Sequence, residues 1–407
     1  MPSAPSRRAR LALAAVSTLA ALAIGEAALR LAGVSNPNFY QPDPVRGWAL
    51  APGAEGWWRS EGRAYVRINR DGERDVEHAV AKPAGVLRIA VLGDSCTEAL
   101  QVPVEQTFWK LLEPALASCP ALAGRAHGVE VLNFGVAGYG TAQELLTLRE
   151  KVWKYAPDVV VLAFYAGNDV RNNYRRLEQD PGRPYFVLRG PQGALALDDS
   201  FRETLGYRVR RSPPAEALYA LFNHSRLLGV AKRGKGVVDG WIGAAKARRK
   251  ETGEALQELG LDNAVYSPPR DEDWRAAWAV TEAILAEMQR EAAGHGAAFG
   301  LLSLSTGIQV DPDLAKRTAF MRRLGVASLF YPDHRLEAWG AAHRVPTLAL
   351  APPLADLAVR ERVHLHGFPN TAPGEGHWNA RGHAAAAPLV ADWICRDLAA
   401  PARVGGQ

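Results

Sequence analysis

Residues 158–165 read Asp-Val-Val-Val-Leu-Ala-Phe-Tyr, with no polar side chain between Val159 and Phe164. A strand with one face in water alternates apolar and polar residues, whereas a strand covered on both faces is apolar throughout. The stretch therefore predicts a buried strand in a sheet that carries other elements on both faces.

Similar signals lie on both sides of this strand. Further strands are expected at residues 87–92, 129–134, 299–304 and 345–351, and helices at 274–293, 333–343 and 380–398, the last with a possible kink at Pro388. A capping box, Thr141-Ala142-Gln143-Glu144, predicts another helix that ends before Pro157. Strands alternating with helices imply right-handed crossovers, and hence an α/β fold with a parallel central sheet.

The N-terminus has the pattern of an export or membrane signal. Arg7, Arg8 and Arg10 precede an apolar run over residues 11–24. This run is shorter than the ~20 residues that span a bilayer. It continues to residue 32 if Glu26 pairs with Arg30 one turn later. Residues 1–33 are therefore either an uncleaved membrane anchor or a signal peptide cleaved after residues 21–23, and both place the rest outside the cytoplasm. The alternative is an ordinary helix of a cytosolic protein.

The rest of the chain is divided by composition. The sequence predicts a linker with a small β extension at 34–84, one domain at 85–400 and a flexible tail at 401–407. The helix–strand rhythm breaks at about 171–270, which indicates an insertion after the third strand. It contains a hairpin at 181–197 around Gly190-Pro191, and a charged helical stretch headed by residues 248–250.

Composition excludes several classes of protein. The 407 residues carry 48 basic and 43 acidic side chains, a net charge of +5. So small an excess over this length is unlike a dedicated nucleic-acid-binding protein. Three cysteines are too few for a disulfide-rich scaffold.

Polar residues follow the strand ends, where parallel sheets bind ligands. The first predicted strand ends at Gly93-Asp94-Ser95, the second leads into the glycine-rich residues 135–140, and the third is followed by Gly167-Asn168-Asp169. Gly376-His377 precedes the last helix. A serine, anion-binding backbone and amide groups, and a histidine are therefore expected at one edge of the sheet.

This set of four blocks resembles the SGNH (GDSL-type) hydrolase family, over roughly residues 87–169 and 345–398. The resemblance implies a flavodoxin-like three-layer fold. It implies Ser95 as nucleophile and His377 as general base. It also implies an oxyanion hole formed by the N–H groups of Ser95 and Gly138 and the side chain of Asn168. No metal and no cofactor are expected.

The sequence leaves the identity of the third catalytic group, the acid that orients the histidine, undecided. The family has an aspartate three residues before the histidine, where this chain has Gly374. Glu375 is the nearest carboxylate and is expected to orient His377. Asp356, or a Ser–His dyad without an acid, are the alternatives.

The other polar residues near these blocks have ordinary interpretations. Cys96 is expected to be a buried thiol, and Asp169 a turn or capping residue. Trp378 is expected in the core and His383 as a structural partner. His364, His366, His377 and His383 lack the spacing of a zinc motif.

The expected function is therefore a serine esterase acting on O-acyl esters, acetyl above all, of a polysaccharide or lipid outside the cytoplasm. An O-acyltransferase would use the same residues, and a non-catalytic polysaccharide-binding or assembly protein would keep the fold. In a flavodoxin-like sheet the first and last helices share a face, so Cys119 and Cys395 can form a disulfide in an oxidising compartment. The expected partners are an ester substrate and a membrane, and no nucleic acid.

Overall fold

The computed structural model describes residues 6–34, 38–124, 126–231 and 262–399. Its central sheet has five parallel strands: β5 (Val86–Gly93), β6 (Gly128–Gly135), β7 (Val159–Phe164), β10 (Ala298–Ser303) and β11 (Thr347–Ala349). They lie in the order β11-β10-β7-β5-β6. Counted along the chain this order is 2-1-3-4-5, which is that of flavodoxin-like folds. The predicted α/β class and parallel sheet are confirmed.

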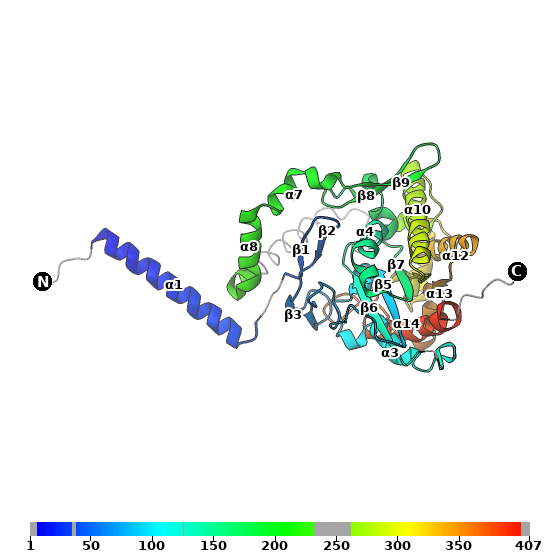
Figure 1. Ribbon diagram of the computed structural model, residues 1–407, viewed down its shortest axis with the longest axis horizontal. Coiled ribbons are helices and arrows are strands. Elements are labelled where there is room, and N and C mark those ends of the chain that lie inside the picture. Colours follow the sequence, from blue (N-terminus) through cyan, green and yellow to red (C-terminus); the bar gives the residue numbers. More distant parts are fainter. Residues whose placement is uncertain (1–5, 35–37, 125, 232–261, 400–407) are drawn as a thin grey trace.

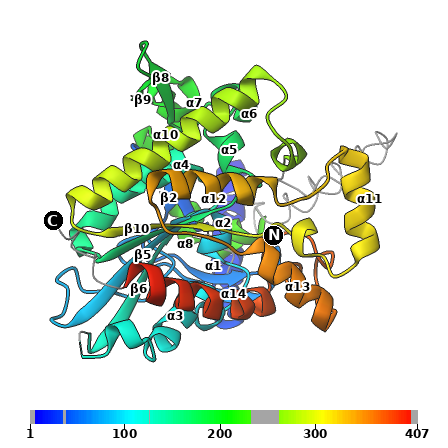
Figure 2. The ribbon, with the colours of Figure 1, turned by 90° about the vertical axis from the view of Figure 1, so that its right-hand side faces the viewer.

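Helices cover both faces of the sheet (Figure 2). One face is covered by α4 (Thr141–Thr147), α10 (Glu272–Gly294) and α12 (Tyr331–His343), and the other by α3 (Phe108–Leu116), α13 (Ala351–Glu361) and α14 (Ala380–Trp393). The burial of β7 on both faces explains why its sequence is apolar throughout. Val160 and Leu162 pack into the first core, and Val159 and Val161 into the second.

Two local predictions differ from the structure. Helix α4 begins at Thr141, but its first turn is not closed by a capping box: the side chain of Asn173 accepts a hydrogen bond from Ala142 N at 2.9 Å, and Glu144 is fully buried. The strand expected at 345–351 is shorter, because a helix with prolines in its first turn, α13, starts at Ala351. Helix α11 (Leu314–Leu324) was not predicted.

The extension and the insertion contain regular structure. The extension has two hairpins rather than one β segment: β1 (Tyr40–Asp43) with β2 (Gly47–Leu50), and β3 (Glu55–Trp58) with β4 (Ala64–Arg67). After β7 come α5 (Asp169–Asn172), α6 (Arg175–Glu178), the hairpin of β8 (Tyr185–Arg189) and β9 (Ala194–Asp198), α7 (Leu205–Arg210) and α8 (Pro213–His224). The predicted charged stretch at 248–250 and the tail at 401–407 lie outside the described residues.

The N-terminal segment is one helix, α1 (Arg7–Leu31), that projects away from the body of the protein (Figure 1). None of its residues is buried, and its most apolar window has a mean hydropathy of 1.8. Glu26 and Arg30 form the expected ion pair at 2.8 Å. By length and composition this helix can cross a membrane.

A disulfide joins Cys119, just after α3, to Cys395, just after α14. The two helices pack against each other on one face of the sheet. Cys96 is buried elsewhere in the same core. The bridge ties together segments 276 residues apart.

Removing this bridge is expected to destabilise the protein. The double variant Cys119→Ser/Cys395→Ser should lose about 2–4 kcal/mol of unfolding free energy, since the cross-link restricts a long loop in the unfolded chain. Chemical denaturation followed by circular dichroism measures the loss. Reduction of the native protein with dithiothreitol should lower its Tm in the same way, and an unchanged Tm would contradict the prediction.

Candidate active site

Ser95 lies directly after β5, at the point where the strand order of the sheet reverses between β5 and β7. It is the first residue of the short helix α2 (Ser95–Glu98). The preceding Asp94 is fully buried, and its carboxylate accepts a hydrogen bond from Cys96 N at 2.9 Å. Ser95 itself is only half-buried. Crevices at such reversal points are the usual ligand sites of open α/β sheets.

His377 meets Ser95 from the other end of the chain. Its Nε2 lies 2.8 Å from Ser95 Oγ. The neighbouring Trp378 is buried, and its indole donates to Ser305 Oγ at 2.9 Å. Gly367 N donates to the carbonyl of His377 at 3.1 Å. These contacts hold the histidine loop against the sheet, and the structure brings the two sequence-predicted residues into hydrogen-bond contact.

The carboxylate on the far side of the imidazole is Glu61. Its Oε2 lies 2.5 Å from His377 Nδ1, and its Oε1 accepts a hydrogen bond from His377 N at 2.7 Å. Since Nδ1 donates to this carboxylate, Nε2 of the neutral ring is left to accept the proton of Ser95. The order Glu61–His377–Ser95 is that of a serine–histidine–acid triad.

Glu375 is not at this position, contrary to the expectation from the sequence. It lies in a turn between Gly374 and Gly376, which both have positive φ, and its side chain is exposed. Asp356 is exposed on α13. A side chain at Gly376 would also collide with Glu61, because its Cβ would lie 2.2 Å from Oε1. The absence of a side chain at Gly376 therefore leaves room for the distant glutamate.

Glu61 sits in the turn between β3 and β4, and this turn is fixed by the loop that precedes His377. Gly62 N donates to Asn370 Oδ1 at 2.9 Å. The amide of Asn370 in turn donates to the carbonyls of Arg59 and Gly62, at 3.1 and 3.2 Å. Trp58 Nε1 donates to the carbonyl of Glu61 at 2.9 Å. The position of Glu61 is thus set by backbone contacts on both sides of it.

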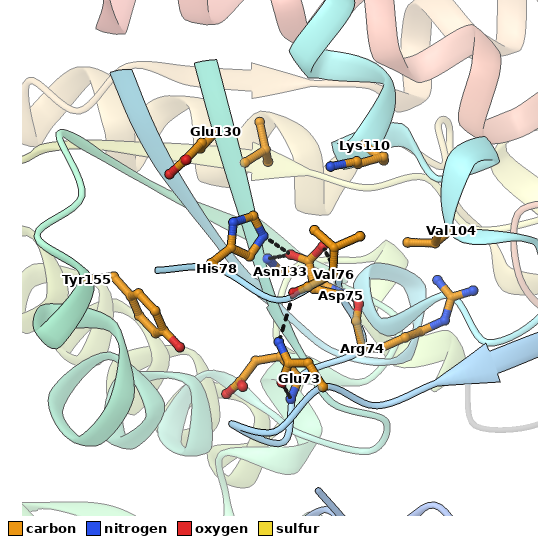
Figure 3. A network of polar contacts seen from close by, with 12 residues as sticks. Glu73, Arg74, Asp75, Val76, His78, Val104, Lys110, Glu130, Asn133 and Tyr155 are labelled. Carbon is orange, nitrogen blue, oxygen red and sulfur yellow. Dashed lines mark hydrogen bonds and ion pairs between the residues drawn. The ribbon is translucent and has the colours of Figure 1, made fainter. Parts of the chain in front are cut away.

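The same extension is attached to the edge strand β6 (Figure 3). The carboxylate of Asp75 accepts a hydrogen bond from Asn133 N at 2.9 Å and lies 3.2 Å from His78 Nε2. The side chain of Asn133 bridges Arg74 O and Gly135 N, at 3.0 and 2.9 Å. An edge strand has unpaired backbone groups, and Asp75 satisfies one of them. The segment expected to be a linker with a small β extension is therefore attached to the sheet, and its Glu61 contacts His377.

Two further residues expected at the site lie on neighbouring loops. Gly138 follows β6 with a φ of +77°, and its carbonyl accepts a hydrogen bond from Arg183 Nη2 at 2.7 Å. Asn168 precedes α5, and its Nδ2 donates to Asp94 Oδ2 at 3.0 Å. An asparagine amide has two N–H groups. The bond to Asp94 fixes the amide plane and leaves the second N–H for another acceptor.

Electrostatics favour an ion pair between the histidine and the glutamate. Burial disfavours the charged form of both groups, but their mutual hydrogen bond and attraction outweigh it. The pKa of Glu61 is consequently lowered and that of His377 raised. Beneath the site, burial raises the pKa of three carboxyl groups, Asp94, Glu144 and Asp169.

Two other histidines near the site, His366 and His383, serve the packing. His366 Nδ1 donates to Gly376 O at 2.7 Å, and His383 Nδ1 accepts from Phe108 N at 3.2 Å. Burial lowers their pKa values to about 4 and about 3, so both rings are neutral at pH 7. The buried carboxylate of Asp169 accepts a hydrogen bond from Tyr165 N at 2.8 Å. It stabilises the turn after β7.

The similarity of this chain to known proteins lies among solved structures, at low sequence identity. No family model and no curated protein matches the chain. Similar solved structures include an acetylxylan esterase from Geobacillus stearothermophilus, with 12% identity over 78% of this chain and 97% of that one, at a TM-score of 0.37. A lipase/acylhydrolase from Enterococcus faecalis has 14% identity over 77% and 97% of the two chains, at a TM-score of 0.34. The strand order of the sheet defines a three-layer α/β protein. At the carboxyl edge of this sheet lie a serine, a histidine and a glutamate in hydrogen-bond contact.

Proposed function

We propose that this protein is a serine esterase that hydrolyses O-acyl esters. The observation that carries the proposal is the continuous chain of hydrogen bonds from Glu61 through His377 to Ser95. A serine hydroxyl is a weak nucleophile unless a base accepts its proton, and a base is most effective when a third group holds it in the right tautomer.

In this proposal Ser95 Oγ attacks the ester carbonyl while His377 Nε2 takes its proton. The charge that develops on the carbonyl oxygen is stabilised by the N–H groups of Ser95 and Gly138 and by the free N–H of Asn168. Each such donor contributes roughly 2.7–4 kcal/mol in measured oxyanion holes. His377 then gives its proton to the departing alcohol. Water attacks the acyl-enzyme while His377 removes its proton. The bond between the acyl carbon and Ser95 Oγ then breaks, His377 returns the proton to Oγ, and the acid is released.

The proposed place of action is the outer side of a membrane. Helix α1 serves as an uncleaved anchor whose N-terminal arginines stay in the cytoplasm. The disulfide between Cys119 and Cys395 supports an oxidising compartment for the domain that follows. Acyl esters, acetyl above all, of exported polysaccharides or of lipids are the substrates within reach there.

A serine-directed fluorophosphonate tests this function directly. We expect it to label the full-length protein in detergent once per chain, with Ser95 as the modified residue in peptide mass spectrometry. Release of acetate from an acetylated polysaccharide, without transfer to an added sugar, would identify hydrolysis. A folded protein that takes up no label belongs instead to the non-catalytic binding class.

The raised pKa of His377 predicts the pH dependence of the reaction. The base must be neutral, so kcat/KM should fall as the pH drops through an apparent pKa above the ordinary histidine value of 6.5. Loss of the negative charge in Glu61→Gln should move this midpoint to lower pH. A pH series with p-nitrophenyl acetate measures both midpoints. A native midpoint at or below 6.5 would contradict the assignment of His377 as a base paired with Glu61.

A further inference from the structure

Two helices of the insertion expose apolar side chains. On α7, Leu205 is 77% exposed and Val209 is 54% exposed, one helical turn apart. On α8, Leu218 and Leu221 are 52% and 55% exposed. Single exposed leucines are common, but apolar residues repeated at helical spacing on two successive helices form a face.

This face is connected to the N-terminal helix. The carboxylate of Glu26, on α1, accepts hydrogen bonds from Arg226 N and Leu227 N, both at 3.0 Å, and from Ser225 Oγ at 3.1 Å. These three residues directly follow α8. In Figure 1, α8 lies beside the C-terminal end of α1.

Two further contacts join the end of α1 to α8. A Cβ atom at Gly25 would lie 3.4 Å from Leu227, so the two segments touch there. Asn38, a few residues after α1, donates a hydrogen bond to the hydroxyl of Tyr219 on α8. At 100° per residue, Leu221 lies on the side of α8 opposite Tyr219 and Leu218 lies on one flank. Neither of these apolar residues therefore lies on the side of α8 that contacts Asn38.

The length of α1 fixes the level of this junction relative to a bilayer. Twenty-five residues of helix extend roughly 37 Å, against a hydrocarbon core of about 30 Å. When Arg7, Arg8 and Arg10 lie at the inner headgroups, the hydrocarbon core that starts at Leu11 ends near Arg30, and Glu26 lies one turn, about 6 Å, inside that outer boundary. The residues hydrogen-bonded to Glu26 are at the same level.

The charges around the face suit an anionic surface. Of the four arginines in residues 200–221, Arg202 and Arg211 form ion pairs with Asp199 and Glu216, at 3.2 and 3.0 Å. Arg208 and Arg210, both exposed on α7, are then the side chains that can bind lipid phosphates. An interfacial helix combines an apolar side, which enters the headgroup boundary, with basic side chains that bind lipid phosphates.

We propose that α7 and α8 form a second membrane contact, which lies on the outer surface of an anionic phospholipid bilayer next to α1. Leu205, Val209, Leu218 and Leu221 enter the headgroup region of the lipid. The inference rests on the proposed anchoring by α1. It gives the insertion a role: to hold the catalytic domain at a fixed orientation on the membrane.

Spin-label accessibility in nanodiscs tests this contact on the full-length chain. Single variants Leu218→Cys and Leu221→Cys are labelled, after a check that the native protein takes up no label. In discs of phosphatidylcholine and phosphatidylglycerol, we expect both labels to be more accessible to oxygen than to a water-soluble nickel complex. Leu314→Cys is the matched control, because Leu314 is a 55% exposed leucine on α11, and its label should favour the nickel complex.

A label at Leu19→Cys, in the middle of α1, distinguishes the membrane contact of α7 and α8 from the anchoring by α1. If this label reports lipid while the labels at 218 and 221 behave like the label at 314, the inference is wrong and the anchor stands. If the label at 19 is also in water, anchoring itself fails. In discs without phosphatidylglycerol, the label at 218 should lie less deep in the bilayer. An equal depth of this label in both lipids would rule out binding of the arginines to anionic lipid.

Discussion

Ser95→Ala is expected to abolish ester hydrolysis and fluorophosphonate labelling. The hydroxyl oxygen of Ser95 is the only protein atom that bonds to the acyl group in the proposed reaction, so no other group of the protein replaces it. In a well-studied serine protease, loss of the nucleophile lowers kcat on the order of 10⁶-fold, and we expect a loss approaching that size. Turnover of p-nitrophenyl acetate by the purified full-length variant gives the measurement.

The neighbouring residue supplies a matched control for this experiment. Cys96→Ala changes the adjacent buried thiol and should leave both labelling and turnover close to native. Circular dichroism and Tm should show that both variants are folded. Undiminished turnover in Ser95→Ala would refute the nucleophile, and loss of labelling in Cys96→Ala alone would transfer that role to the thiol.

Glu61→Gln should have the second largest effect, a loss in kcat of about 10⁴-fold by analogy with amide replacement of a triad carboxylate. Glutamine is nearly the same size but carries no charge. It cannot stabilise the imidazolium, and its amide can donate to Nδ1 and so favour the wrong tautomer. Steady-state kinetics should show the loss in kcat rather than in KM, since Glu61 contacts His377 and lies on the side of the ring away from Ser95.

Glu375→Gln is the control for Glu61, because this carboxylate is two residues from His377 in sequence but is exposed. We expect its kcat to stay near the native value. If Glu61→Gln loses less than about tenfold, the enzyme works as a Ser–His dyad. If Glu375→Gln shows the large loss instead, the loop rearranges in solution and the sequence-based assignment is right.

The fold was predictable because local sequence signals and tertiary burial agree. Strand β7 is apolar in every residue and lies between two other strands with helices on both faces. The failures occur where a distant group overrides a local pattern. Asn173 caps α4 in place of Thr141. The start of α13 is a different case, because Pro352 and Pro353 are a local signal: proline is well tolerated in the first turn of a helix.

The site was predictable only where its residues stand in local sequence motifs. Ser95 and His377 stand in short motifs next to predicted strand and helix ends, so their positions can be seen in the sequence. Glu61 cannot be found in this way. It is 316 residues from His377 and lies in a turn with no motif of its own, and any of the 43 acidic residues could meet the chemical requirement. The glycine at 376 was a usable signal, because a small residue beside the histidine leaves space for an incoming side chain.

The origin of Glu61 in the extension has a practical consequence for protein production. A shortened gene that begins at residue 85 would encode the serine and the histidine without their carboxylate. A product of this kind that folds would be nearly inactive for want of Glu61, and would be mistaken for a pseudoenzyme. Soluble expression should instead start near Asn38, which removes the apolar helix and retains both hairpins.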